Sequence, residues 1–90
     1  MSWSTRAIRS QGHRRGATAR RSALADAFVD SWVSWREASD DVRAAYRWWS
    51  ECARPQRALA FACYRAALDR EQHAASIHAD CAERVRALGL

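Results

Sequence analysis

The stretch that decides the fold is residues 22–55, SALADAFVDSWVSWREASDDVRAAYRWWSECARP. Apolar side chains recur through it at steps of three and four residues, the spacing of one face of an α-helix. The members of this stripe are Leu24, Phe28, Trp32, Trp35, Ala38, Val42, Ala45, Trp49 and Cys52. The stripe covers about 30 residues, so it predicts a helix about 45 Å long.

Three positions set the expected ends of this helix. Ser22 is a residue type that favours the N-cap position, and Pro55 lacks the N–H needed to continue a helix. Ser39, followed by Asp40 and Asp41, resembles a second cap with acids in the first turn of a new helix. The sequence therefore predicts one long helix that ends before Pro55. The alternative is a break near Ser39, which would give three helices in all.

Beyond Pro55, the sequence up to Leu88 has no other proline and no glycine, and it is rich in alanine, the residue with the highest helix propensity. Gly89 follows where a helix stop is expected. Because a tight turn between two long helices places them antiparallel, we predict an all-α, coiled-coil-like helical hairpin. The sequence lacks the regularly spaced turn residues that would indicate strands.

The position of the turn also predicts which residues face one another. If it centres near Arg54, facing residues have numbers that sum to about 108. The expected neighbours are Trp48 and Trp49 with residues 59–61, Val42 with Ala66, Trp35 with His73, Trp32 with Ile77, and Phe28 with Cys81.

The apolar surface is wider than one stripe on each helix. Val29, Val33 and Trp48 lie off the first stripe, and a helix that is apolar over much of its circumference needs cover on more than one side. The simplest cover is a second copy that completes a four-helix bundle, although another helical protein would serve. The candidate contact residues are Trp32, Trp35, Trp48, Trp49, Phe61 and Tyr64. Trp48 is the expected exposed anchor, and plain core packing is the competing interpretation.

The N-terminal segment differs from the rest of the chain. Residues 1–20 hold few apolar groups, so we predict a basic, disordered arm before a helical hairpin domain at residues 21–90. The segment up to residue 25 carries no acid, and its basic residues are Arg6, Arg9, Arg14, Arg15, Arg20 and Arg21. Such a segment suits phosphate contacts with nucleic acid. A solubilising tail is the simpler explanation.

Only one grouping resembles a metal site. His78 and Cys81 are three residues apart on one helix face, and the predicted pairing places Asp26 and Asp30 opposite them. The alternative is a half-buried His78 bonded to Asp30, with Cys81 as a small apolar filler. Two of the three cysteines lie too far apart along one helix to bridge, so we expect free thiols and no cofactor.

Signals for catalysis, membranes and export are lacking in the sequence. It has no Gly-x-Ser-x-Gly, phosphate-binding glycine loop, Cys-x-x-Cys or His-Glu-x-x-His motif, so we expect no enzyme. No apolar run approaches a membrane span, and Asp26 and Asp30 interrupt any signal-peptide core. Basic residues that are all arginine, with abundant alanine, are typical of a GC-rich bacterial genome. We therefore expect a cytoplasmic bacterial interaction protein, with nucleic-acid association through the arm as the alternative.

Overall fold

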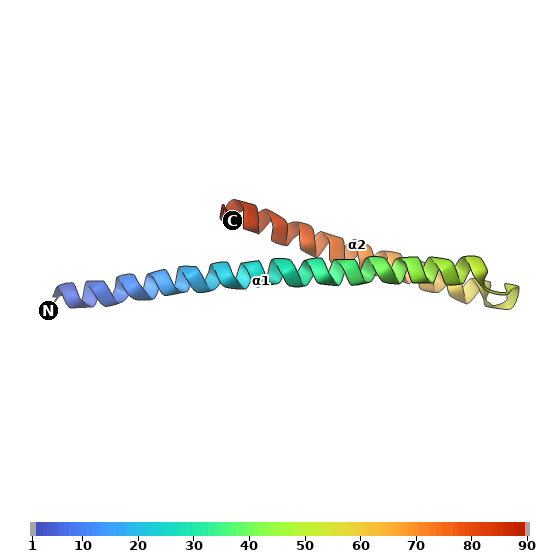
Figure 1. Ribbon diagram of the computed structural model, residues 1–90, viewed down its shortest axis with the longest axis horizontal. Coiled ribbons are helices and arrows are strands. Elements are labelled where there is room, and N and C mark those ends of the chain that lie inside the picture. The colour runs from blue at the N-terminus through green and yellow to red at the C-terminus, as the bar shows by residue number, and fades with distance from the viewer. Residues whose placement is uncertain (1, 90) are drawn as a thin grey trace.

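Two long antiparallel helices joined by a short turn make up the protein (Figure 1). The computed structural model describes the backbone of residues 2–89 and the side chains of residues 15–89. Helix α1 spans Ser2–Glu51, the 3₁₀ turn η1 spans Arg54–Gln56, and helix α2 spans Arg57–Ala87. There is no strand among residues 2–89. The prediction of an all-α hairpin is confirmed.

The turn between the helices is built around Pro55. The last backbone bond of α1 runs from the Cys52 N–H to the Trp48 carbonyl oxygen, at 2.9 Å. Ala53 then adopts an extended conformation (φ −67°, ψ 154°), which turns the chain away from the axis of α1. One 3₁₀ turn containing Pro55 follows, closed by a 3.0 Å bond from the Gln56 N–H to the Ala53 oxygen. Helix α2 therefore begins at Arg57, two residues after Pro55, because this 3₁₀ turn precedes it.

Helix α1 is continuous through both serines that the sequence marked as caps. It begins at Ser2 rather than near Ser22, and it does not break at Ser39, so the three-helix alternative is wrong. Asp40 forms a surface ion pair with Arg43, 3.5 Å away and three residues later, as neighbours on an unbroken helix do. The stripe that packs on α2 continues through this region, since Ala38 and Val42 are both half-buried. Packing thus overrides the local cap signal.

Only part of α1 is paired with α2. Figure 1 shows α1 extending past the C-terminal end of α2, toward its own N-terminus. The unpaired part corresponds roughly to the basic segment that the sequence set apart. The division into an arm at residues 1–20 and a hairpin domain at residues 21–90 stays a prediction.

The contact between the helices is thin. Among the described residues only Ala60 and Ala67 are buried hydrophobic residues, and no large side chain is fully enclosed. The backbone measures 80 × 19 × 13 Å, with a radius of gyration of 22.0 Å. A compact domain of this length has a radius of gyration of about 12 Å. The molecule is therefore a two-helix rod with a single seam and open flanks.

Candidate interaction surface

Four aromatic rings meet beside the turn, two from each helix. Trp49 contacts Phe61 and Tyr64, with ring centroids 5.1 and 5.5 Å apart, and the latter pair is stacked. Tyr46 packs edge-on against Tyr64 at 5.6 Å and against Trp49 at 6.0 Å. Tilted, stacked and edge-on geometries at these distances are favourable for aromatic pairs. Trp49 next to Phe61 was predicted from the position of the turn.

A second aromatic cluster surrounds His78, farther from the turn. The ring of His78 lies 4.8 Å from Phe28 and 5.5 Å from Trp35, centroid to centroid. Its Nδ1 is 2.9 Å from the Ser31 hydroxyl oxygen, and that hydroxyl also lies 2.9 Å from the Phe28 carbonyl oxygen. Because the hydroxyl has one hydrogen, which it donates to the carbonyl, its oxygen accepts from an Nδ1–H of His78. The Trp35 indole nitrogen is buried and has no hydrogen-bond partner in this part of the chain.

This second cluster corrects one expected neighbour. His78 bonds to Ser31, whereas the predicted partner Asp30 is exposed. Trp35 and Phe28, whose expected neighbours were His73 and Cys81, both pack on His78.

We call one flank of the hairpin, on the side where Tyr46 meets Tyr64, the aromatic face. It is defined by Trp32, Tyr46, Phe61, Tyr64 and Leu68. Trp32 precedes Tyr46 by fourteen residues, so both lie on one side of α1, and Tyr46 touches Tyr64 of α2. Leu68 follows Phe61 by seven residues on α2 and is therefore on the same side.

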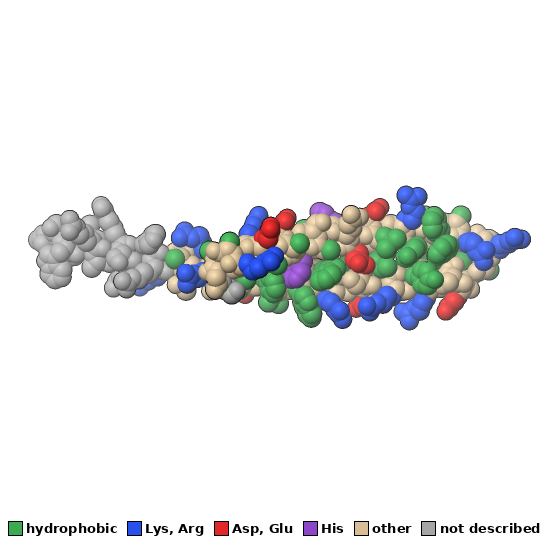
Figure 2. Space-filling model, turned by 90° about the horizontal axis from the view of Figure 1, so that it is seen from above, with side chains coloured by type: hydrophobic (Ala, Val, Ile, Leu, Met, Phe, Trp, Pro, Cys, Tyr) green, Lys and Arg blue, Asp and Glu red, His purple; other side chains and the backbone are tan. Residues whose placement is uncertain are grey.

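Much of the aromatic face is open to solvent. Trp32 is 47% exposed and Tyr46 is 50% exposed, while Phe61 and Leu68 are close to 40%. The guanidinium carbon of Arg36 lies 5.9 Å from the centre of the Trp32 ring, a cation–π arrangement at the edge of this face. Figure 2 shows hydrophobic side chains gathered in two patches, one near the turn and one farther along beside a histidine.

The surface of the aromatic face is hollowed next to Tyr46. A groove of about 660 Å³ lies here, lined by Asp40, Val42, Arg43, Tyr46, Arg47 and Tyr64. A smaller hollow of about 280 Å³ adjoins it, lined by Tyr46, Trp49, Ser50 and Arg57. Tyr46 borders both hollows, and each has aromatic and arginine side chains in its lining.

Trp48 lies on the opposite flank. It is two residues from Tyr46, and so about 200° away around the helix. The same separation places Leu59 opposite Phe61 on α2. Trp48 is 39% exposed and Leu59 is 62% exposed. The predicted anchor is therefore partly exposed, but it is not part of the aromatic face.

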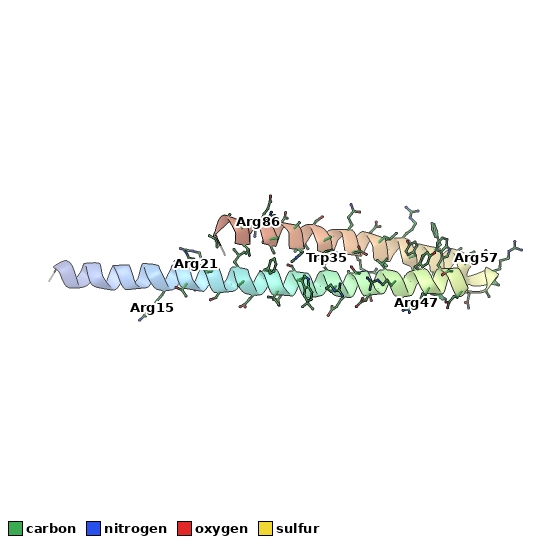
Figure 3. All side chains as sticks on the ribbon, turned by 45° about the horizontal axis from the view of Figure 1, so that its top comes forward. Arg15, Arg21, Trp35, Arg47, Arg57 and Arg86 are labelled. Carbon is green, nitrogen blue, oxygen red and sulfur yellow. The ribbon has the colours of Figure 1, made fainter. Side chains whose placement is uncertain are left out.

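The arginine side chains point away from the seam. Figure 3 shows Trp35 between the helices, whereas Arg15, Arg47 and Arg57 project outward. Arg15, Arg20 and Arg21 are all exposed on the part of the arm whose side chains are described. The other predicted phosphate-binding residues, Arg6, Arg9 and Arg14, lie outside the described side chains.

The groups that the sequence offered to a metal are not gathered into a site. Within the described residues, no three of the His, Cys, Asp and Glu side chains come together as metal ligands would. His78 faces Ser31, and Cys81 is half-buried. The three thiols, those of Cys52, Cys63 and Cys81, are free. This leaves the interaction surface as the feature from which a function can be argued.

Comparisons with known proteins do not change this basis. No family model matches the chain, and no curated protein or solved structure matches it. None of the described helices contains an apolar stretch long enough to cross a membrane. The candidate surface therefore rests on its own geometry.

Of the six residues that the sequence singled out for contact, the structure groups Trp49, Phe61 and Tyr64 near the turn. Trp35 belongs to the second cluster, Trp32 lies on the open part of the aromatic face, and Trp48 is on the other flank. The sequence reasoning missed Tyr46, which lies off the apolar stripe. Its spacing of seven residues from Ser39 and fourteen from Trp32 was the available signal.

Proposed function

We propose that this chain is a non-enzymatic helical interaction protein that associates with a copy of itself or with another helical protein. The observation that carries the proposal is the mismatch between a core of small side chains and large apolar side chains left open. Ala60 and Ala67 are buried, while Trp32, Tyr46 and Leu59 are 47%, 50% and 62% exposed. Large exposed apolar patches are typical of interaction surfaces.

The composition of the surface supports the same proposal. Tryptophan, tyrosine and arginine are the residues that most often dominate the binding energy of protein interfaces. The aromatic face combines all three, with Trp32 and Tyr46 on the face and Arg43 beside the groove. Burying one large apolar side chain stabilises a complex by about 1.5–3 kcal/mol. Several such side chains, each about half exposed, therefore oppose the entropy cost of association.

The experiment for this proposal is sedimentation velocity of the purified chain at several concentrations. We expect a species of at least twice the chain mass, populated more strongly as concentration rises. If the chain alone is monomeric, addition of a helical partner must produce the heavier species. A stable monomer that binds no protein would contradict the proposal.

A second candidate function is association with nucleic acid through the arm. Arg15, Arg20 and Arg21 are exposed on the stretch of α1 toward its N-terminus, where α2 ends. Arginines spaced along an uncovered helix suit non-specific phosphate contacts, which weaken steeply as salt rises.

A mobility-shift assay on duplex DNA and on RNA tests this second candidate. The intact chain is compared with a chain that lacks residues 1–21, at low and at moderate salt. We expect binding by the intact chain at low salt, loss of most of it at moderate salt, and none by the shortened chain. Equal binding by both chains would show that the arm is not the contact.

A further inference from the structure

We propose that the aromatic face docks a second copy of this chain in antiparallel orientation, with the two-fold axis passing beside Ser39. This inference rests on the proposed function and names its surface, its occupant and its geometry. In this arrangement α1 lies along the partner's α1 and α2 along the partner's α2, so that two hairpins stack face to face as a four-helix bundle. The turns then lie at opposite ends of the bundle.

The size of the face suits a stable dimer. Helix α2 has 31 residues, so the paired part of the hairpin is about 46 Å long at 1.5 Å per residue. With the 19 Å width of the rod, one flank presents roughly 900 Å². Stable protein interfaces bury about 800 Å² on each partner. One flank of the paired hairpin is therefore large enough.

The spacing of the large side chains on α1 is symmetric about Ser39. Trp32 and Tyr46 are each seven residues from Ser39, which is two helical turns, so all three lie on one stripe. An antiparallel two-fold at Ser39 places Trp32 opposite the partner's Tyr46, and Tyr46 opposite the partner's Trp32. Ser39 is small and half-buried, which lets the two α1 backbones approach at the crossing point. The open aromatic side chains of each copy thereby cover those of the other.

Charge favours the same geometry. A dimer with both turns at one end would instead bring together two N-terminal segments that each carry six arginines and no acid up to residue 25. That repulsion disfavours the alternative orientation.

Matched tryptophan variants test the choice of face. Trp32→Glu places a charge on the aromatic face, and Trp48→Glu places the same charge on the opposite flank at a similar exposed position. By sedimentation equilibrium we expect Trp32→Glu to raise the dimer dissociation constant by at least about 100-fold, the effect of losing an interface anchor. Trp48→Glu is expected to change it by less than about threefold. Circular dichroism confirms that both variants remain helical.

Disulfide trapping tests the orientation. In a chain with Cys52, Cys63 and Cys81 each replaced by serine, Ser39→Cys places two thiols next to the axis. We expect a covalent dimer under mild oxidation, because bridging requires Cα atoms within about 7 Å. Ser50→Cys, on the same side of α1, is the control: the proposed axis separates the two copies of residue 50 by about 33 Å, so no bridge forms.

The outcomes separate this inference from the proposed function. A dimer that Trp48→Glu disrupts and Trp32→Glu does not would overturn the choice of face while leaving an interaction protein. Trapping through residue 50 but not through residue 39 would overturn the antiparallel axis alone. A monomer at all concentrations would remove the second copy as the occupant, while binding of a different helical protein would keep the proposed function.

Discussion

At the scale of single residues, few side chains of this protein are fully buried. The seam between the helices depends on Ala60 and Ala67, whose methyl groups let the backbones approach, while tryptophans and tyrosines flank them. Because protein interiors are close-packed, a larger side chain at such a position has to displace its neighbours. The same enlargement on the outer side of α2 meets only solvent.

The first prediction follows from this contrast. We expect Ala60→Leu to lower the free energy of unfolding by about 1–3 kcal/mol, as overpacking does. Ala62→Leu, an exposed position on the same helix, is expected to change it by no more than about 0.5 kcal/mol. Urea denaturation at one fixed protein concentration measures both. Equal effects of the two changes would mean that α2 does not approach α1 through Ala60.

The second prediction concerns the hydrogen bond between Ser31 and His78. Ser31→Ala removes the buried acceptor of the His78 Nδ1–H, at a cost of about 1 kcal/mol of unfolding free energy. Ser34→Ala, on an exposed part of α1, is the control and is expected to be neutral or slightly stabilising, since alanine favours helix. The nitrogen chemical shifts of His78 should also show a proton on Nδ1 in the neutral ring. A proton on Nε2 alone would contradict the assigned bond.

At the scale of elements, the continuity of α1 is decided by packing. Ser39, Asp40 and Asp41 have the composition of a helix start, yet the helix passes through them because its neighbours on the stripe pack on α2 on both sides. The end of the helix is different, since Pro55 removes a backbone donor whatever the tertiary context. Local chemistry thus controls the turn, while contact between helices controls the continuity.

The third prediction concerns whether replacing Ser39 raises or lowers stability, which differs between a helix start and a continuous helix. A serine cap replaced by alanine destabilises a helix by about 1 kcal/mol. Inside a continuous helix the same change is mildly stabilising, by a few tenths of a kcal/mol. We expect Ser39→Ala to raise the thermal midpoint slightly. A clear fall in the midpoint would show that a helix begins at this position.

At the scale of the whole molecule, the rod has too little interior to enclose its own large side chains. Two helices meet along one seam only, and both flanks of that seam are open, with Tyr46 on one and Trp48 on the other. Small domains generally bury a low fraction of their surface and are stabilised by association when their core is insufficient. The proposed association would therefore couple the stability of this protein to its concentration.

The fourth prediction follows from that coupling. If copies associate in the folded state only, the thermal midpoint rises with protein concentration. We expect an increase of several degrees across a hundredfold range of concentration, measured by circular dichroism at 222 nm. Trp32→Glu should abolish most of this dependence. A midpoint of the intact chain that is independent of concentration would count against self-association.

The sequence by itself determined the helical class, the hairpin and the position of the turn. The three- and four-residue spacing of apolar side chains and the absence of a donor on Pro55 are local properties, present before any tertiary contact. It also indicated an excess of apolar surface, because that excess can be counted on each helix separately.

Only the tertiary structure decided which side chains share a flank. In the structure Tyr46 packs against Tyr64, Trp48 lies on the other flank, and His78 is hydrogen-bonded to Ser31 rather than to Asp30. The contacts of a long side chain depend on its rotamer and on the rotation of one helix about its axis relative to the other, and neither is written in residue spacing. Rotating one helix about its axis by a fraction of a turn would move side chains from the seam to the surface. Which side chains share a face is therefore determined only when the helices pack.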